Sequence, residues 1–511
     1  MQALPSSISF PRAIVLCLLA GGLSVLSFAP FKIWPLQLIA LATLFYSAQQ
    51  MTSIQRVAWL GWAFAFSSLA IGTHWLYVSL HDYGGLHPLL TVSAVLLLAA
   101  GLGLLYAAAL AAAAWLSHRI KNISVAYLLI MPACWMLADW TRGWIFTGFS
   151  WLATGYAHTA SPLSAYAAYV GVYGLSWLAG LLAGCIAMML HQKSLNKLAL
   201  GFLFGLPLFG FVLQSYSWTT PIGSQITVRL LQGNVAQEMK FAPNQLNQTL
   251  LMYQQMLIEQ PADLIVTPET ALPVFPSELP ADYLKNLSDF AQTTRSQLII
   301  GLPWTTAPDV YFNSVLGLGT NNTTPYRYDK HHLVPFGEFI PLGAHWFINL
   351  MHIPLGDFTR GQEIQAAMPV KDQWILPNIC YEDLFGEEIA HQLRAAQQQG
   401  KPVASILLNV SNIAWFGDTI ALPQHLQISQ MRTLETGRPM LRATNTGATA
   451  IINAQGELQA SLPAFERATL TGQVQGMQGQ TPYILFGNFL PVGLACSLLF
   501  LLWLRARRNH S

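Results

Sequence analysis

Three side chains in the second half of the chain have the chemistry of a covalent catalytic site. Cys380 follows the strand-like run Trp374–Ile379 and precedes acidic residues that are typical of a helix start. Backbone N–H groups at such a turn stabilise a thiolate and can bind an oxyanion. Glu269 follows a buried strand and could act as the general base, while the ammonium of Lys330 could stabilise a tetrahedral oxyanion. The pattern predicts a cysteine nucleophile, with an inert buried thiol and two surface charges as the structural alternative.

The elements that would position these residues alternate between strand and helix patterns. We expect strands at 226–231, 263–267, 297–300, 374–376 and 405–409, a helix at 245–260 and a late hairpin at 449–458. Such alternation indicates an α/β layered domain. Most charged residues lie in the same part of the chain, between 217 and 481, and this part is long enough to bury a full core.

The composition excludes a purely soluble protein. Apolar residues make up 53% of the 511 residues and charged residues only 9%, whereas soluble domains carry roughly 25% charged residues. The sparse charge and the 12% of aromatic residues also exclude a disordered chain. A net charge of +2 gives no electrostatic case for nucleic acid as a partner.

Eight apolar stretches are long enough, or nearly so, to cross a bilayer. They lie near 11–29, 33–49, 57–79, 88–117, 123–142, 162–190, 197–215 and 483–504. The sequence therefore predicts a membrane domain with seven spans at 1–216, a soluble domain at 217–481, and an eighth span with a basic tail at 482–511. Buried core helices are the alternative for all of them, and a cleaved signal peptide is an alternative for the first.

The basic residues predict how these spans are oriented. With a cytoplasmic N-terminus, only Lys32 and Arg142 fall in outer loops. The basic residues at the inner ends are Arg12, Arg56, Arg119, Lys121, Lys193, Lys197, Arg505, Arg507 and Arg508. An odd number of spans before residue 217 then places the soluble domain outside the cytoplasm and both termini inside it.

Two of the expected outer loops, at 73–82 and 139–148, are rich in aromatic and polar residues. An interfacial aromatic belt explains this composition. The alternative is a site for a lipid headgroup, in which the guanidinium of Arg142 would bind a phosphate.

No cofactor pattern accompanies these residues. No Cys or His pair has zinc spacing, and no Gly-rich phosphate loop ends in Lys-Ser or Lys-Thr. Cys380 has no partner cysteine within 217–481, so we expect a free thiol there. Neither a metal nor another cofactor is expected.

Longer motifs extend the pattern along most of the chain. They are Gly233-Asn234, Pro268-Glu269, the run from Tyr326 to Pro341 that contains Lys330 and His332-Leu-Val-Pro-Phe-Gly-Glu338, Cys380-Tyr-Glu382, Asn409-Val-Ser-Asn412 with Ala414-Trp-Phe-Gly-Asp418, and Gly437-Arg-Pro with Arg442-Ala-Thr-Asn-Thr-Gly447. With these motifs the chain resembles the apolipoprotein N-acyltransferases of Gram-negative bacteria, which are membrane members of the nitrilase (carbon–nitrogen hydrolase) superfamily. The resemblance implies a polytopic α-helical membrane bundle of eight spans with an inserted nitrilase-like α-β-β-α sandwich domain. It also implies a place in the bacterial inner membrane, with the catalytic domain on the periplasmic side.

The resemblance assigns roles to individual residues. The catalytic triad of the family matches Glu269, Lys330 and Cys380. Its additional catalytic-site glutamate matches Glu338, and two further required residues match Tyr381, through its backbone N–H, and Glu382. The chain departs from the family pattern at Phe241, where a tryptophan is usual, and at Ile413, where an acid is usual.

Substrate binding is expected from Arg142 and from aromatic residues near the site. These aromatic residues are Phe241, Trp346, Phe347, Trp415 and Phe416. The segment Trp346–Ile353 is more apolar than a surface loop needs to be. We expect a mobile lid or a membrane-dipping arm there, with a covered loop packed on the core as the alternative.

The resemblance implies acyl transfer in two steps. Cys380 attacks an ester of a phospholipid, phosphatidylethanolamine being the expected donor, and the thioester is then attacked by the N-terminal amine of an S-diacylglyceryl-cysteine apolipoprotein. One alternative is a membrane-anchored amidase or hydrolase that uses the same triad with water as acceptor. Another is a transporter or a lipoprotein-binding protein without catalysis, which the nearly uncharged spans disfavour.

Overall fold

The computed structural model describes residues 8–237, 243–319, 325–340 and 358–508. The chain divides into two compact units. Unit 1 consists of Met1–Leu76, Pro88–Tyr216 and Phe486–Ser511, and unit 2 consists of Tyr77–His87 and Ser217–Leu485. The sequence did not predict that Tyr77–His87 groups with the second unit, since it lies between two apolar stretches of the first.

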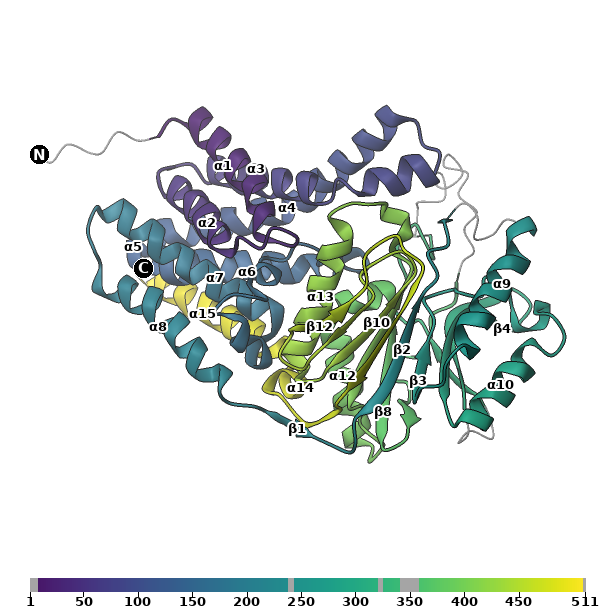
Figure 1. The fold of residues 1–511 in the computed structure, drawn as a ribbon. Helices are drawn as coiled ribbons and strands as arrows, with labels where there is room; N and C mark the ends of the chain where they lie inside the picture. Colours follow the sequence, from purple (N-terminus) through teal and green to yellow (C-terminus); the bar gives the residue numbers. More distant parts are fainter. Residues whose placement is uncertain (1–7, 238–242, 320–324, 341–357, 509–511) are drawn as a thin grey trace, which may run out of the picture. The chain divides into compact units, whose positions relative to one another are not determined.

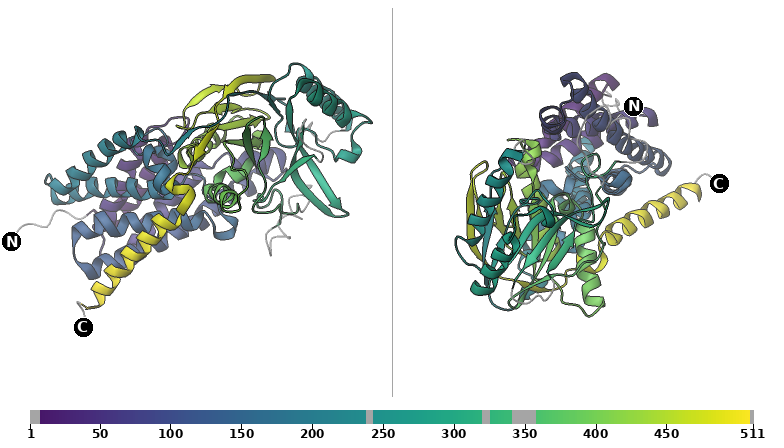
Figure 2. Two further views of the ribbon diagram at one scale, coloured as in Figure 1. Left: turned by 90° about the horizontal axis from the view of Figure 1, so that it is seen from below. Right: turned by 90° about the vertical axis from the view of Figure 1, so that its right-hand side faces the viewer.

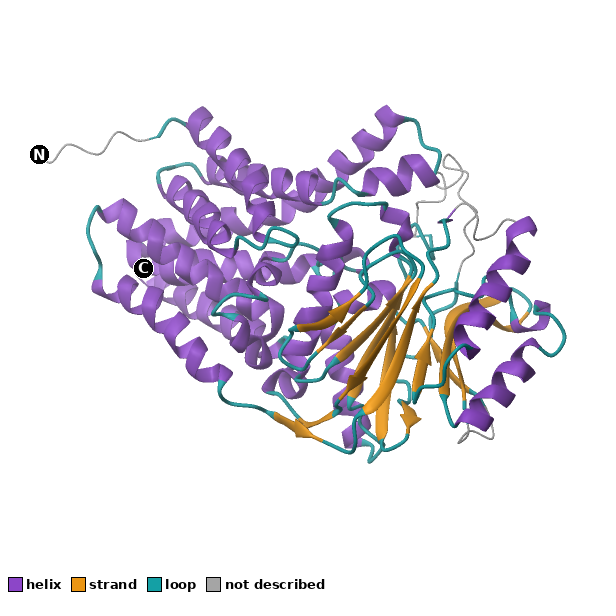
Figure 3. Ribbon diagram, in the orientation of Figure 1, coloured by secondary structure: helices purple, strands orange, loops and turns teal. Residues whose placement is uncertain are grey.

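Unit 1 is built from helices, drawn in purple in Figure 3. They are α1 (Phe10–Ser24), α2 (Trp34–Gln49), α3 (Ile54–Gly72), α4 (Pro88–Ile120), α5 (Ile123–Val125), α6 (Met131–Arg142), α7 (Ala167–Gln192), α8 (Lys197–Gln214) and α15 (Phe489–Arg508). Among the described residues, seven helical stretches have the length and hydropathy to cross a membrane. The expected second span is helix α2, but with 16 residues it is shorter than these seven.

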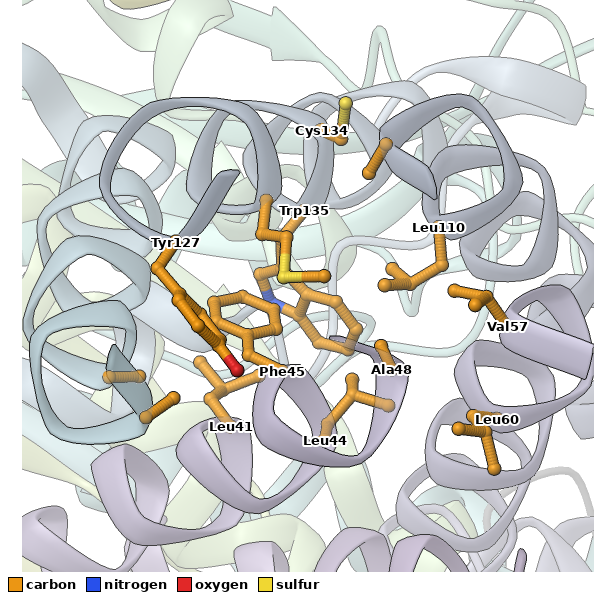
Figure 4. Packing of buried hydrophobic residues seen from close by; sticks show 14 of the residues in the cluster. Leu41, Leu44, Phe45, Ala48, Val57, Leu60, Leu110, Tyr127, Cys134 and Trp135 are labelled. Atoms are coloured by element: carbon orange, nitrogen blue, oxygen red, sulfur yellow. The ribbon is translucent and has the colours of Figure 1, made fainter. Parts of the chain in front are cut away.

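Close packing of small and aromatic side chains holds these helices together. Leu41, Leu44 and Phe45 of α2 lie in one buried cluster with Trp135 of α6 (Figure 4). A Cβ atom on Gly184 of α7 would lie 2.0 Å from the carbonyl oxygen of Tyr127, so the glycine permits a close helix approach. Helix α15 packs on α4, α6 and α7 of the same unit (Figure 2). Van der Waals packing of this kind stabilises helices in lipid, where apolar burial alone gives little preference.

The described residues of unit 2 form two six-stranded sheets and a two-stranded one. The first large sheet has the order β13 (Ala468–Val474), β2 (Ile226–Gln232), β3 (Leu264–Val266), β4 (Gln297–Ala307), β5 (Val310–Leu318) and β6 (Tyr326–Asp329). The second has the order β12 (Leu458–Ser461), β11 (Ala450–Ile452), β10 (Met440–Thr444), β9 (Ile406–Ser411), β8 (Gln373–Ile379) and β7 (Met368–Val370), and β1 (Thr219–Pro221) pairs with β14 (Met477–Gly479). The helices are α9 (Pro243–Ile258), α10 (Tyr283–Thr294), α12 (Gly386–Gln398), α13 (Ala421–Thr436) and α14 (Pro482–Phe486), the last of which ends at the boundary with unit 1.

The buried side chains of unit 2 follow the alternation of its strands. One cluster contains side chains from both large sheets, such as Leu230 of β2 and Leu408 of β9. The neighbouring residues Leu231 and Leu407 belong to two other clusters, formed with α9 and α10 and with α12. Helices α9 and α10 lie beside each other next to the sheet that contains β3 and β4 (Figure 1). Since successive strand residues point to opposite faces, the nearly continuous burial of β2, β3, β8 and β9 means that both faces of the two large sheets are covered at these central strands.

The strands expected from the sequence are present. The expected runs correspond to β2, β3, β4, β8 and β9, the expected helix to α9, and the late hairpin to the antiparallel pair β11 and β12. Strand β4 extends to Ala307, well beyond the expected run. Strands β1, β5, β6, β7, β10, β13 and β14 were not predicted.

Candidate active site

The expected catalytic residues lie just beyond the carboxyl ends of strands. Glu269 follows β3 after two residues, while Lys330, Cys380 and Asn412 directly follow β6, β8 and β9. Strands β3 and β4 are parallel, and β4 and β6 are both antiparallel to β5, so β3 and β6 end at the same edge of their sheet. Strands β8 and β9 are parallel in the other sheet. Active-site residues of α/β sheets gather at such edges.

Two carboxylates enclose the ammonium group of Lys330. Its Nζ lies 3.2 Å from Oε1 of Glu269 and 2.8 Å from Oε1 of Glu338. The Nδ2 group of Asn313, on β5, donates to the same two oxygens at 2.8 Å each. The other oxygen of Glu269 accepts from the backbone N–H of Asn412 at 2.8 Å. Hydrogen bonds and charge thus join five groups from four segments of the chain, since Lys330 and Glu338 share one connection.

This cluster keeps Lys330 charged. Burial by itself lowers the pKa of the ammonium, but the carboxylates of Glu269 and Glu338 outweigh it and hold that pKa above its usual value. The side chain of Lys330 is 1% exposed. A fixed cation in such a dry place stabilises negative charge that develops beside it far better than a cation in water would.

Cys380 lies on a sharp turn between a strand and a helix, as the sequence predicts. The residue follows β8, begins the short 3-10 helix Cys380–Leu384 and is followed by α12. Its φ of +53° lies in the left-handed region, which residues other than glycine seldom adopt. The side chain is half-buried. A backbone outlier at this position is typical of a functional site.

The thiol of Cys380 interacts electrostatically with the same cluster. Burial first and the carboxylate of Glu269 second raise its pKa to about 12, while the ammonium of Lys330 opposes both. The backbone N–H of Asn412 also lowers this pKa through a hydrogen bond. The resting thiol is therefore protonated, and a nucleophilic attack by its sulfur requires a general base.

Glu382 joins the segments that carry the nucleophile and the lysine. Its Oε2 accepts from the N–H of Ile379 at 2.6 Å, and its Oε1 accepts from the N–H of His331 at 2.6 Å. The hydroxyl of Tyr328 and the N–H of His332 donate at 3.1 and 3.2 Å. Burial raises the pKa of this carboxyl to about 7, and the backbone donors oppose that rise. Glu382 is positioned to align Cys380 and Lys330.

Arg142, for which the sequence offered a lipid headgroup as a ligand, is enclosed by groups of its own unit. Its side chain is 1% exposed at the end of α6. The guanidinium donates to the hydroxyl of Tyr106 and to the carbonyls of Phe149 and Trp151, and lies 3.8 Å from the carboxylate of Asp139. Because these internal partners hold the guanidinium, Arg142 stabilises the fold of unit 1.

The other expected residues occupy different surroundings. Trp415 is 39% exposed on the 3-10 helix η10 (Ile413–Phe416), which follows Asn412, and Phe416 is half-buried there. The carbonyl of Trp415 accepts from the hydroxyl of Ser79, and its ring lies 5.5 Å from that of Tyr83. Tyr381 is buried beside the rings of His332 and Phe385. Phe241, Trp346 and Phe347 lie outside the described residues.

Two contributors were missed by the sequence analysis. Asn313 is a polar residue within the apolar run of β5, and a buried amide in such a run signals a specific partner. Asn412 belongs to a recognised motif, but only the structure shows that its backbone N–H binds Glu269. Within the described ranges, no group of three or more His, Cys, Asp or Glu side chains could hold a metal ion.

Comparisons with known proteins show which families the chain resembles. Residues 20–185 match the model of the apolipoprotein N-acyltransferase N-terminal domain, and residues 227–483 match that of the carbon–nitrogen hydrolases. A Ralstonia nicotianae protein named apolipoprotein N-acyltransferase is 46% identical over 97% of this chain and 94% of its own. A Nitrosomonas europaea protein of the same name is 44% identical over 94% of each chain. The solved structure of Saccharomyces cerevisiae Nit3, described as a member of the nitrilase superfamily, covers 50% of this chain and 91% of its own with 15% identity and a TM-score of 0.37.

Proposed function

This chain belongs to the apolipoprotein N-acyltransferase family, and from that premise we propose that it transfers a fatty acyl chain from a phospholipid to the N-terminal amine of S-diacylglyceryl-cysteine apolipoproteins. It is an acyltransferase of lipoprotein biosynthesis and a membrane protein. The observation that carries the proposal is the cluster of Glu269, Lys330 and Glu338, coupled to the thiol of Cys380.

In the first half-reaction, Cys380 becomes acylated. Glu269 takes the thiol proton while the sulfur attacks the carbonyl carbon of the sn-1 ester of the phospholipid. Lys330 and the backbone N–H of Tyr381 stabilise the negative oxygen of the tetrahedral intermediate. The ester C–O bond then breaks, and lysophospholipid leaves with the proton that Glu269 returns. A protonated resting thiol fits this scheme, because the base acts as the attack occurs.

In the second half-reaction, the amine of the apolipoprotein attacks the thioester carbon. Glu269 accepts a proton from the amine, the C–S bond breaks, and the sulfur of Cys380 recovers a proton. Glu338 and Asn313 act by position, since both hold the Lys330–Glu269 pair through hydrogen bonds of 2.8 Å. A thioester suits this relay because amines attack it readily, while a shielded pocket limits hydrolysis.

The proposal also covers the number of membrane spans, the layers of the soluble domain and the side of the membrane on which that domain lies. Eight spans, the 16-residue α2 among them, would carry an α-β-β-α domain at 217–481 between the seventh span and the eighth. The excess of basic residues at alternate ends supports a catalytic domain on the periplasmic side of the bacterial inner membrane, with both termini in the cytoplasm. Phosphatidylethanolamine is the proposed donor.

The proposed contacts with substrate come from aromatic residues. Trp415 is the best supported, because it is partly exposed on a segment that begins one residue after Asn412. Phe416 is its neighbour, and roles for Phe241 and for Trp346 and Phe347 of the expected lid stay predictions. Aromatic and apolar side chains at this edge would suit the fatty chains of both substrates.

Mass spectrometry of the intact protein after incubation with phosphatidylethanolamine vesicles tests the reaction. We expect a mass increase of one acyl group that disappears in Cys380→Ser and persists in the matched control Cys496→Ser, whose thiol is exposed on α15. Addition of a diacylglyceryl peptide should remove the adduct and yield N-acylated peptide. Release of free fatty acid at the same rate with and without the peptide would instead favour the hydrolase, and absence of any adduct on the unmodified protein would refute covalent catalysis.

A further inference from the structure

Side chains that do not belong to the catalytic cluster form hydrogen bonds with the backbone of Cys380. Its carbonyl accepts a hydrogen bond from Nδ2 of Asn409 at 3.3 Å. The imidazole of His425, on α13, forms a second hydrogen bond with the backbone of Cys380. This contact favours the protonated imidazole, so the backbone group is an acceptor, the carbonyl of Cys380. A left-handed residue needs such external support to keep its conformation.

The protonation state of His425 follows from its other partner. Nη2 of Arg442 lies 2.9 Å from Nδ1 of the imidazole. A guanidinium only donates hydrogen bonds, so Nδ1 must be the acceptor and carry no proton. Burial and then the charge of Arg442 hold the pKa of His425 well below its usual value. The neutral ring therefore carries its proton on Nε2, the nitrogen left to donate to the carbonyl of Cys380.

Arg442 is in turn tied back to the segment of the nucleophile. Its Nη1 lies 3.2 Å from Oδ2 of Asp383, which is three residues after Cys380 in the same 3-10 helix. Ser429 bonds both Asp383 and Arg442, and the Nε of Arg442 donates to the carbonyl of Ala448 at 3.2 Å. The side chains of Asp383, His425, Ser429 and Arg442 are at most 1% exposed. These contacts close a buried ring that begins and ends on the turn of the nucleophile.

We propose that His425 is a positioning residue for the nucleophile, and that the Asp383–Arg442 pair fixes its tautomer so that Nε2–H holds the carbonyl of Cys380. The imidazole does not touch the reacting atoms. It keeps the left-handed turn in the conformation that directs the sulfur toward Glu269 and Lys330. The inference rests on the proposed function only because that function makes Cys380 the nucleophile.

Two amide variants separate positioning from folding. In His425→Gln, the side-chain NH2 reaches the place of Nε2 and can still donate to the carbonyl of Cys380. In His425→Asn, the shorter side chain can still accept from Arg442 but lacks that donor. His391→Leu, on the partly exposed face of α12, is the matched control because His391 pairs with Glu363, which is not a member of this ring.

The rate of acyl-enzyme formation at saturating phospholipid is measured for each variant, with the half-saturating phospholipid concentration and the melting temperature. Because a displacement of about 1 Å can cost ~100-fold in rate, we expect His425→Asn to be roughly 30- to 100-fold slower with an unchanged half-saturating concentration. His425→Gln and the control should stay within about fivefold of the unmodified protein. Equal rates for both amide variants, or losses of rate that follow the losses of melting temperature, would overturn the proposal.

Alkylation of Cys380 by iodoacetamide distinguishes this inference from the proposed function. The reagent needs no lipid, but it still needs the thiol to lose its proton to a nearby base. We expect His425→Asn to slow alkylation and His425→Gln to restore it, even if no acyl-enzyme forms on the unmodified protein. An alkylation rate that is the same in both variants would refute the positioning role.

Discussion

Replacing Glu382 by glutamine tests whether one carboxylate aligns the nucleophile with its cation. Four donors converge on this side chain, two on each oxygen. One of them is the N–H of Ile379, directly before Cys380, and another is the N–H of His331, directly after Lys330. A glutamine offers one acceptor oxygen, so two of the four donors would face an NH2 group.

The size of the effect follows from this count. A hydrogen bond to a charged group contributes about 1.5–3 kcal/mol, so the loss of two destabilises unit 2 by about 3–6 kcal/mol. In a domain of this size, such a loss lowers the melting temperature by roughly 10 °C. A shift of about 1 Å between Cys380 and Lys330 would slow acylation by up to ~100-fold.

The assay compares acyl-enzyme formation and thermal unfolding of purified Glu382→Gln with those of Glu278→Gln. Glu278 is a matched control because its carboxylate also accepts a backbone N–H, from Phe275, but on the surface. The pKa of Glu382, raised to about 7, adds a second test. As the pH falls through about 7, the carboxylate of Glu382 gains a proton and loses acceptor capacity, so the acylation rate of the unmodified protein should fall. The acylation rate of the glutamine variant should not fall in this pH range, because its amide does not titrate.

A glutamine variant with full acylation and the original melting temperature would refute the reasoning. So would a loss of equal size in Glu278→Gln, because the effect would then come from any lost carboxylate. A melting temperature that drops while the acylation rate stays unchanged would leave Glu382 a structural role only.

Three further outcomes are expected. Asn313→Leu removes the donor shared by two carboxylates and should slow acylation by at least ~10-fold, measured as adduct formation; an unchanged rate would show that Lys330 alone suffices. Because burial raises the pKa of Cys380 to about 12, the rate of its alkylation by a small reagent should show no inflection with pH below about pH 10. The rate is measured in a protein in which Cys496 is replaced, and an inflection near pH 8 would contradict a protonated resting thiol. Arg142→Leu leaves its carboxylate partner buried without the cation and should destabilise the protein by about 3–5 kcal/mol in thermal unfolding; normal stability with weaker phospholipid binding would restore the headgroup interpretation.

The sequence predicted the site better than its surroundings. The positions of Glu269 and Cys380 after β3 and β8 follow from continuous apolar runs, which are strong local signals. Asn313 was missed because its role depends on lateral pairing of β5 with β4 and β6, and pairing partners are not encoded in local periodicity. The positions of Glu382 and His425 along the sequence do not show that their side chains support the backbone around Cys380.

The internal partners of Arg142 could not be anticipated from the sequence, for a physical reason. A lone arginine beside aromatic residues in a loop looks the same in sequence whether it faces lipid or the interior. Its acceptors are backbone carbonyls of Phe149 and Trp151 and the hydroxyl of Tyr106, 36 residues away. Carbonyl acceptors leave no residue-type signature, so burial of this guanidinium could not be predicted from composition or spacing.

The segment Tyr77–His87 has a practical consequence for protein production. It enters unit 2 from the chain between α3 and α4, and there Ser79 and Tyr83 hold the loop that carries Trp415. A recombinant fragment that starts at Ser217 and stops at Leu485 would lack this piece of its own fold. Such a fragment would expose more of the ring of Trp415 and tend to self-associate, so a soluble version of the catalytic half needs these eleven residues supplied by grafting or as a separate peptide.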